Sequence, residues 1–219
     1  MGIFQENRFM TDLRTGAAGA VAMKHCSTPD QENVGFIGAG AIARNMARAA
    51  AAVRPFKGFV YALDDEMAQD FAKSMSEELG MPFKVSESAE ACCNESDVLF
   101  TQTPGASTVL EKEWLKESGV TIIASGSDQP TKQEIPNDVL KASKYISDLT
   151  KQTSKVGELR GALQAGIMTE SDVYAELGEI VNGDKPGREG SEIIVVDLTG
   201  TGAQDAAIGQ VAWDALSQL

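Results

Sequence analysis

Six short apolar runs recur along the chain, each five to seven residues long and bounded by polar or glycine residues. Runs this short and this nearly continuous in apolar residues are typical of strands that are buried on both faces of a sheet. The predicted strands are residues 33–37, 58–63, 97–103, 120–125, 144–148 and 192–198.

Helical patterns precede, separate and follow these runs. The predicted helices are residues 9–25, 41–53, 66–79, 155–165, 171–181 and 203–216. Strands that alternate with helices predict an α/β fold with a Rossmann-like, doubly wound and mostly parallel sheet, flanked here by an N-terminal and a C-terminal helix.

The first predicted helix has a composition of its own. Thr11 is the expected N-cap, and Lys24 and His25 suit the last turn. Residues 16–22 are nearly all small, which predicts close packing of this helix against a flat surface.

A glycine-rich turn, Gly38-Ala39-Gly40-Ala41-Ile42-Ala43, follows the first predicted strand directly and opens a helix. This is the context in which a G-x-G-x-x-G/A sequence binds the pyrophosphate of a dinucleotide. Gly38 permits the tight turn, Gly40 lets the phosphates approach the backbone, and a small third residue lets helix and strand touch. The alternative is a glycine-rich turn without a ligand.

The end of the second predicted strand bears on the choice of cofactor. Asp64 and Asp65 lie there, where an acidic side chain would bind the ribose hydroxyls of NAD. No Arg or Lys stands at this strand end to receive a 2′-phosphate, so NAD is favoured over NADP. Asp64 is equally well placed to cap the following helix.

The net charge of the chain disfavours two classes of binding partner. There are 19 Lys and Arg against 32 Asp and Glu, a net charge of −13. Such a field repels a phosphate backbone and an anionic membrane surface, and no apolar run approaches the roughly 20 residues of a spanning helix. We therefore expect neither nucleic acid nor a membrane as partner.

The few histidine and cysteine residues exclude or disfavour several kinds of functional site. His25 is the single histidine, so His-rich metal sites are excluded and a Ser-His-Asp triad is disfavoured; we expect an ordinary surface residue there. Cys26, Cys92 and Cys93 have neither zinc spacing nor a disulfide framework. With no signal or transit pattern at the N-terminus, the expected location is cytoplasmic.

Several motifs in a fixed order make the chain, from about residue 8 to its C-terminus, resemble the ornithine cyclodeaminase/mu-crystallin family. Besides the glycine turn, they are Asp12–Ala18 with its Arg14-Thr15 pair, Thr101–Pro104, Gly126–Glu134, Gly157–Leu159 and Gly200–Asp205. The resemblance implies a nicotinamide cofactor and oxidation of an amino acid at its α-amine, or the reverse reduction of an imine.

The resemblance also assigns residues. Asp128 matches the catalytic aspartate that handles a proton of the amine or of water, and Arg14 the arginine beside the substrate carboxylate and the cofactor. Lys132 would complement substrate or cofactor charge. The alternatives without a catalytic or binding role are a turn-forming aspartate, a surface arginine and a solvated lysine, respectively. The cofactor contacts implied are Arg14, Thr15, Gly38, Gly40, Ala41, Ile42, Asp64, Thr103, Ser125 and Thr199.

Two departures from the family pattern matter. Ile42 replaces a common glutamine, and Ala62 stands where NAD-using members often have the ribose aspartate, which leaves the NADP alternative open.

The resemblance implies a domain division as well: residues 1–32 as the remnant of a substrate and dimerisation domain, 33–199 as the dinucleotide-binding domain, and 200–219 as a helix returning to the first. Family members carry a longer segment before the Arg14 motif. The parent protein is accordingly expected to be a homodimer, and without that segment the pocket should be open to water.

Three functions follow as hypotheses. The first is an NAD-dependent amino-acid oxidoreductase or cyclodeaminase, foremost one converting ornithine to proline and ammonia through an imine, with ketimine reductase and alanine dehydrogenase as alternatives. The second is a mu-crystallin-like protein that binds nucleotide without turnover. The third is an inactive, truncated family member.

Overall fold

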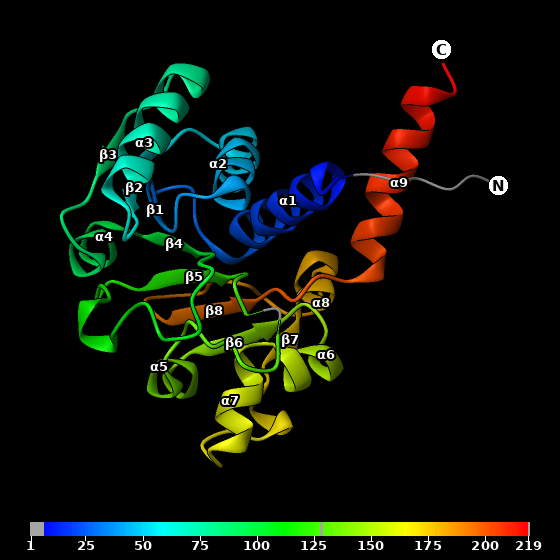
Figure 1. Ribbon diagram of the computed structural model, residues 1–219. Coiled ribbons are helices and arrows are strands. Elements are labelled where there is room, and N and C mark those ends of the chain that lie inside the picture. Colours follow the sequence, from blue (N-terminus) through cyan, green and yellow to red (C-terminus); the bar gives the residue numbers. More distant parts are fainter. Residues whose placement is uncertain (1–6, 128, 219) are drawn as a thin grey trace.

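A computed structural model describes residues 7–127 and 129–218, which form a sheet flanked by helices (Figure 1). Eight strands lie in the order β3-β2-β1-β4-β5-β8-β6-β7, and every described pair is parallel. The strands are β1 Asn33–Ile37, β2 Lys57–Tyr61, β3 Phe83–Val85, β4 Val98–Thr101, β5 Val120–Ala124, β6 Lys144–Ser147, β7 Ala175–Glu176 and β8 Ile193–Asp197. The Rossmann-like, doubly wound α/β class is thereby confirmed.

Helices cover both faces of the sheet. The α-helices are α1 Phe9–Cys26, α2 Ala41–Val53, α3 Asp65–Leu79, α4 Ala89–Glu95, α5 Asn137–Ala142, α6 Thr150–Val156, α7 Glu158–Gln164, α8 Leu177–Asn182 and α9 Gly202–Leu216, with 3₁₀ turns at Lys112–Trp114 and Glu170–Asp172. Residues of α1, α2, α3 and α8 pack in one hydrophobic cluster, and those of α4, α5 and α7 in the other.

Strand periodicity explains the two clusters. Phe36 and Phe100 belong to the first cluster, whereas their chain neighbours Ile37 and Leu99 belong to the second. This division arises because successive side chains of a strand point to opposite faces of the sheet. The first cluster is rich in phenylalanine: the Phe36 ring stacks on Phe100 at 5.2 Å between centroids.

Small residues bring α1 and α2 together. A Cβ at Gly16 would lie 2.6 Å from backbone atoms of Asn45, and one at Gly19 would lie 3.1 Å from the Phe100 ring. The glycine positions of α1 therefore lie against α2 and the Phe100 ring, and α1 also contacts α8, α9 and the strand β5. Thr11 is not the N-cap as predicted, because the helix already begins at Phe9, after Arg8 in a left-handed conformation.

A matched pair of substitutions tests this contact. Gly16→Ala should lower the free energy of unfolding by about 2 kcal/mol, because the two helices must move apart. Gly178→Ala in α8 meets nothing within 4 Å and should raise that free energy by up to about 1 kcal/mol through helix propensity. Urea denaturation compares the two, and changes of equal sign would contradict the packing described.

Four parts of the chain differ from prediction. The strand β3 and the helices α4 and α5 were not predicted. The predicted helix 155–165 is two helices, α6 and α7, divided at Gly157, where a Cβ would collide with the Asp197 carboxylate. The predicted helix 171–181 is a 3₁₀ turn, the two-residue strand β7 and α8, because residues 175–176 pair with β6.

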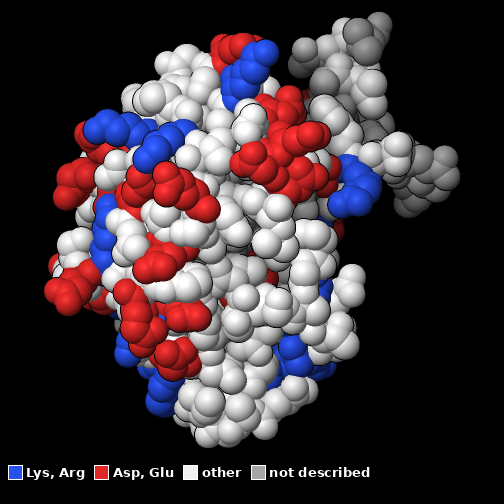
Figure 2. All heavy atoms as spheres, turned by 60° about the vertical axis from the view of Figure 1, so that its left-hand side comes forward, with Lys and Arg blue, Asp and Glu red and all other residues white. Residues whose placement is uncertain are grey.

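The last helix, α9, stands apart from the sheet and contacts α1 (Figure 1). None of its described residues is buried, and Val211, Trp213 and Leu216 are exposed. Acidic residues outnumber basic ones in the whole sequence, and they are prominent among the charged side chains on the face turned forward in Figure 2.

Candidate functional site

The carboxyl ends of β1, β4, β5 and β8 meet at one edge of the sheet, because these strands are parallel neighbours. In a doubly wound sheet, ligands bind at this edge. The sequence-predicted residues Gly38, Thr103, Ser125 and Thr199 all follow these strands, so the fold brings them to a common edge.

The glycine turn has the predicted geometry. Gly38 has a φ of +105°, and a Cβ there would lie 2.7 Å from the carbonyl oxygen of Gln102. The Gln102 side-chain amide also donates to the carbonyl oxygens of Ile37 and Gly38, at 2.9 and 3.0 Å. Gln102 therefore fixes the turn, a role that the analysis of the sequence missed although this residue belongs to a family motif.

Gly40 has different surroundings. It is the N-cap of α2, and a Cβ there would meet nothing within 4 Å, so packing within the described protein does not demand glycine. A hollow of about 420 Å³ lies beside it, lined by Ala39, Gly40, Ala41, Arg44, Asp64, Glu66, Met67 and Asp70. No side chain caps the first turn of α2, which leaves the positive end of the helix dipole directed at this space. The turn therefore fits a pyrophosphate group.

Three acidic side chains and one arginine are among the residues that line this hollow. Asp64 is the N-cap of α3, accepting a hydrogen bond from the Met67 amide at 3.2 Å, so its capping role is present. Arg44 also lines the hollow; it pairs with Asp70 at 2.7 Å and hydrogen-bonds to Ser74. Arg44 was not predicted from the sequence; its signal is its place in the first turn of α2, after the glycines.

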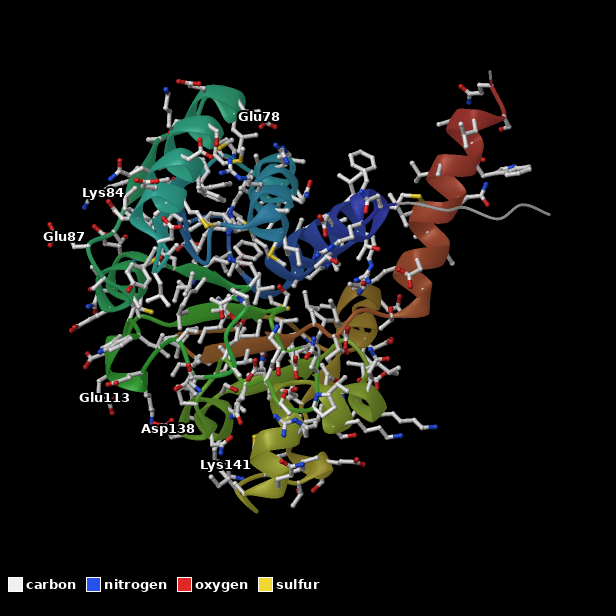
Figure 3. All side chains as sticks on the ribbon, viewed as in Figure 1. Glu78, Lys84, Glu87, Glu113, Asp138 and Lys141 are labelled. Atoms are coloured by element: carbon white, nitrogen blue, oxygen red, sulfur yellow. The ribbon has the colours of Figure 1, made fainter. Side chains whose placement is uncertain are left out.

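A second hollow, of about 300 Å³, adjoins the end of β2. It is lined by Tyr61, Ala62, Leu63, Asp65, Val85, Ser86 and Glu87. Figure 3 shows Glu87 at the outer side of the sheet, after β3. The lining has no Lys or Arg, so this second hollow itself offers no cation for a 2′-phosphate.

Two threonines at the edge are held by carboxylates. Glu134 accepts hydrogen bonds from the amide and the hydroxyl of Thr103, both at 2.6 Å. Asp148 accepts them from the amide and the hydroxyl of Thr199, at 2.8 and 2.9 Å. Between them, Ser125 donates to the Thr101 carbonyl oxygen at 3.3 Å. Asp148 was not predicted, and its signal is its position directly after β6.

Arg14 and Thr15 lie in α1 next to the turn that follows β8. The Arg14 guanidinium donates to Asp205 at 3.0 Å and to the Thr15 hydroxyl at 3.0 Å. A Cβ at Gly200 would lie 2.7 Å from its Nη1. The structure thus brings Arg14 against the edge where Thr199 lies, and also gives it a role in joining α1 to α9.

The loop after β5 carries two predicted residues. Asp128 lies outside the described residues. The backbone of Lys132 is anchored, since its carbonyl oxygen accepts from the Ser127 hydroxyl at 2.6 Å and from Arg160 at 2.9 Å. Lys132 itself is half-buried.

Buried carboxyl groups hold the end of this loop through hydrogen bonds with backbone amides. Glu158 accepts from the amides of Glu134 and Ile135, at 3.0 Å, and Asp197 accepts from the Glu158 amide at 2.8 Å and from the Tyr145 hydroxyl at 2.5 Å. Burial raises the pKa of Glu134 and Glu158, and raises the pKa of Asp197 to about 7. None of these acids was predicted to be buried.

The remaining predictions concern metals and membranes. Within residues 7–127 and 129–218, no group of three His, Cys, Asp or Glu side chains could hold a metal ion. His25 is partly exposed near the end of α1. Burial raises the pKa of all three cysteine thiols to about 12. No helix in the described part of the chain is long and apolar enough to span a bilayer.

Comparison with known proteins decides the family. The profile of the ornithine cyclodeaminase/mu-crystallin family matches residues 3–218. The chain belongs to the ornithine cyclodeaminase/mu-crystallin family. A family relative of known structure, the Δ1-pyrroline-2-carboxylate reductase of Thermococcus litoralis in complex with NADH and L-proline, is 32% identical and superposes with a TM-score of 0.91 over 96% of this chain.

Two further family relatives of known structure hold the oxidised cofactor. The iminosuccinate reductase of Paracoccus denitrificans with NAD⁺ is 35% identical, with a TM-score of 0.86 over 92% of this chain. An archaeal alanine dehydrogenase dimer with bound NAD is 36% identical, with a TM-score of 0.89 over 96%. The chain spans 66%, 62% and 65% of the lengths of these three proteins, in the order given.

Proposed function

We propose that this chain binds NAD at the Gly38–Ala43 turn and belongs to an oxidoreductase that acts on the C–N bond of an amino or imino acid. The observation that carries the proposal is Gly40, whose Cβ position opens on a hollow at an uncapped helix N-terminus. Supporting it, family relatives of known structure hold NADH or NAD⁺, and one of them also holds L-proline.

In this proposal the chain's own residues bind and orient the two reactants. Bound NAD supplies hydride exchange with the carbon that bears the nitrogen. Arg14 grips the substrate carboxylate through parallel N–H donors, and Thr15 holds the Arg14 side chain in place. Asp128 moves a proton at the amine or at water. Lys132 complements negative charge.

The acidic rim of the cofactor hollow favours NAD over NADP in this proposal. Arg44 pairs with Asp70 beside this hollow, and the two remaining carboxylates that line it, Asp64 and Glu66, would repel a 2′-phosphate placed near them. Asp64 can cap α3 and still accept from a ribose hydroxyl, because a carboxylate has several lone pairs.

Two finer activities are proposed for the whole protein. Ornithine cyclodeamination is the activity that the motifs favour, and a related lysine cyclodeaminase of known structure shares the fold at 27% identity. Imine reduction is favoured by the reductases among the relatives at 32% and 35% identity. Cyclodeamination releases ammonia from ornithine without net consumption of NAD, whereas reduction of Δ1-pyrroline-2-carboxylate consumes NADH, so two assays separate them.

Two further proposals concern the oligomeric state of the whole protein and a function without turnover. We propose a homodimer for the whole protein, as in the archaeal alanine dehydrogenase. The mu-crystallin-like alternative predicts the same NAD binding without turnover of any amino or imino acid.

Substitutions at Gly40 test the cofactor site. Both Gly40→Asp and Gly40→Asn should preserve the fold, because there is room for a Cβ and both residues are good N-caps. Gly40→Asp places a carboxylate where the pyrophosphate would lie, and should weaken NAD binding at least tenfold more than the isosteric Gly40→Asn. Calorimetric titration of NAD⁺ measures this.

Thermal midpoints of both variants serve as the control for folding, and NADP⁺ is titrated alongside to test the acidic rim. If wild type and both variants bind NAD⁺ equally, the cofactor site lies elsewhere. If the wild-type chain binds neither nucleotide, the cofactor proposal fails.

A further inference from the structure

Two carboxylates at the carboxyl edge of the sheet hold two threonines in the same way. Glu134 accepts hydrogen bonds from both the amide and the hydroxyl of Thr103. Asp148 accepts them from both the amide and the hydroxyl of Thr199. Thr103 follows β4 and Thr199 follows β8, so the pair flanks β5.

The hydrogen bonds of Asp148 fix the direction of its bond to Thr199. Oδ1 accepts from the amide of Leu149 at 2.7 Å and from the Thr199 hydroxyl, and Oδ2 accepts from the amides of Thr199 and Gly200. Three of these four donors are backbone amides, and a carboxylate oxygen can only accept a hydrogen bond from an amide N–H. The Thr199 hydroxyl therefore gives its single proton to Asp148.

Glu134 acts in the same way on the other side. Its side chain is fully buried, and its Oε1 accepts from the Thr103 amide, which fixes this oxygen as an acceptor. The Thr103 hydroxyl must then donate to the same oxygen at 2.6 Å. The second oxygen, Oε2, has no hydrogen-bond partner among the described residues, and the Thr101 side chain and Lys132 are the other groups that stabilise the carboxylate form of Glu134.

The consequence concerns what each threonine offers a ligand. A hydroxyl has one proton and two lone pairs, and here the proton and the backbone amide are both already used. Thr103 keeps its lone pairs, and Thr199 keeps one because the Gln152 amide donates to it at 3.0 Å. Neither residue can donate a hydrogen bond to a ligand.

We propose that Glu134 and Asp148 are positioning residues that make Thr103 and Thr199 acceptor-only groups, so that this edge selects ligand groups carrying N–H or O–H donors on both sides of β5. The inference rests on the proposed binding of NAD. In that cofactor the matching donors are the carboxamide N–H of the nicotinamide, toward Thr199, and a ribose hydroxyl, toward Thr103.

An analogue without the carboxamide donor tests the proposal. In 3-acetylpyridine adenine dinucleotide a methyl group replaces the amide NH₂, so an acceptor-only Thr199 loses its partner. Calorimetry should show the wild-type chain binding NAD⁺ up to about tenfold more tightly than the analogue, the value of one hydrogen bond. Thr199→Val should remove this preference, and Asp148→Asn should reduce it.

A double-mutant comparison separates positioning from mere stability. Asp148→Asn should have no further effect on the preference once Thr199 is valine, and Glu134→Gln should weaken NAD⁺ binding severalfold in wild type but not in Thr103→Val. If Asp148→Asn does not fold, the two valine variants still give the preference and the NAD⁺ affinity.

The chain offers a matched control. Asp172 accepts from both the amide and the hydroxyl of Thr169, at 2.7 and 2.9 Å, in the turn that precedes β7 and hence at the opposite edge of the sheet. Thr169→Val should leave both affinities unchanged.

The outcomes are distinct. NAD⁺ binding with a preference that Thr199→Val leaves intact would overturn the inference and spare the proposed function. No binding of NAD⁺ by the wild-type chain would overturn both.

Discussion

Asp197→Asn is expected to flatten the dependence of folding stability on pH between pH 4 and pH 7. Asp197 is 1% exposed at the end of β8, and burial raises its pKa from 3.8 to about 7. One carboxyl oxygen, Oδ2, accepts from Tyr145 and from the amide of Glu158, whereas Oδ1 has no partner among the described residues. A proton on Oδ1 relieves the cost of burying the charge.

The sign follows from the two pKa values. Folded Asp197 keeps a proton that the unfolded chain loses above pH 3.8, so its stabilising contribution is complete below that pH and is lost as the pH rises to about 7. The free energy of unfolding should fall by up to about 1.4 kcal/mol per pH unit within this window, the slope that one bound proton gives. Asparagine does not titrate, so the variant loses this slope.

Neighbouring groups leave a slope of the same sign in the variant. The pKa of Glu158 and that of Asp148 are also raised by burial, and Tyr145 shares a hydrogen bond with Asp197. Urea denaturation from pH 4.5 to pH 8 measures the difference between wild type and variant.

Asp172→Asn serves as the control. Bonds from the Thr169 amide and from Lys141 lower the pKa of Asp172 to about 2, so its contribution is already complete above pH 4 and its removal should leave the slope unchanged. Parallel curves for wild type and Asp197→Asn would contradict the assignment of the buried charge.

Gly126→Ala should lower the free energy of unfolding by about 3 kcal/mol, at the upper end of the cost of overpacking. A Cβ at Gly126 would collide with all three atoms of the Glu134 carboxyl group. That group is fully buried and hydrogen-bonded to Thr103, so it cannot swing into solvent without breaking both bonds.

Two comparisons make this result specific. Gly105→Ala, also beside Thr103 but with its nearest atom at 3.6 Å, should change the free energy of unfolding by less than about 0.5 kcal/mol. Glu134→Asp shortens the acid and makes room for the new methyl group. Gly126→Ala combined with Glu134→Asp should therefore be less destabilised than the sum of the single variants; strict additivity would show that the collision is not the cause.

Local pattern was sufficient for the centre of the sheet and for the cofactor turn. β1, β4, β5 and β8 are buried on both sides, so their sequences are continuous apolar runs that stand out from the helices between them. The glycine turn was predictable because its backbone demands are local: a positive φ at Gly38 and open space at Gly40.

The errors arise where a long-range contact decides the structure. Residues 175–176 form a strand only because β6 lies beside them, and two residues leave no period to detect. Gly157 interrupts a helical pattern because Asp197, forty residues later, occupies the space for a side chain. Nothing in the sequence near Glu134 or Asp148 reveals that each meets a threonine from a different strand end.

The position of β8 in the sheet bears on how the chain acquires its structure. β8 lies between β5 and β6, although it is the last of the described strands to leave the ribosome. Until it is made, β5 and β6 each keep an open edge, and the two parts of the sheet have no strand to join them. Because such edges invite pairing with other chains, the interval before residue 197 emerges should be the one in which the nascent protein most needs protection from aggregation.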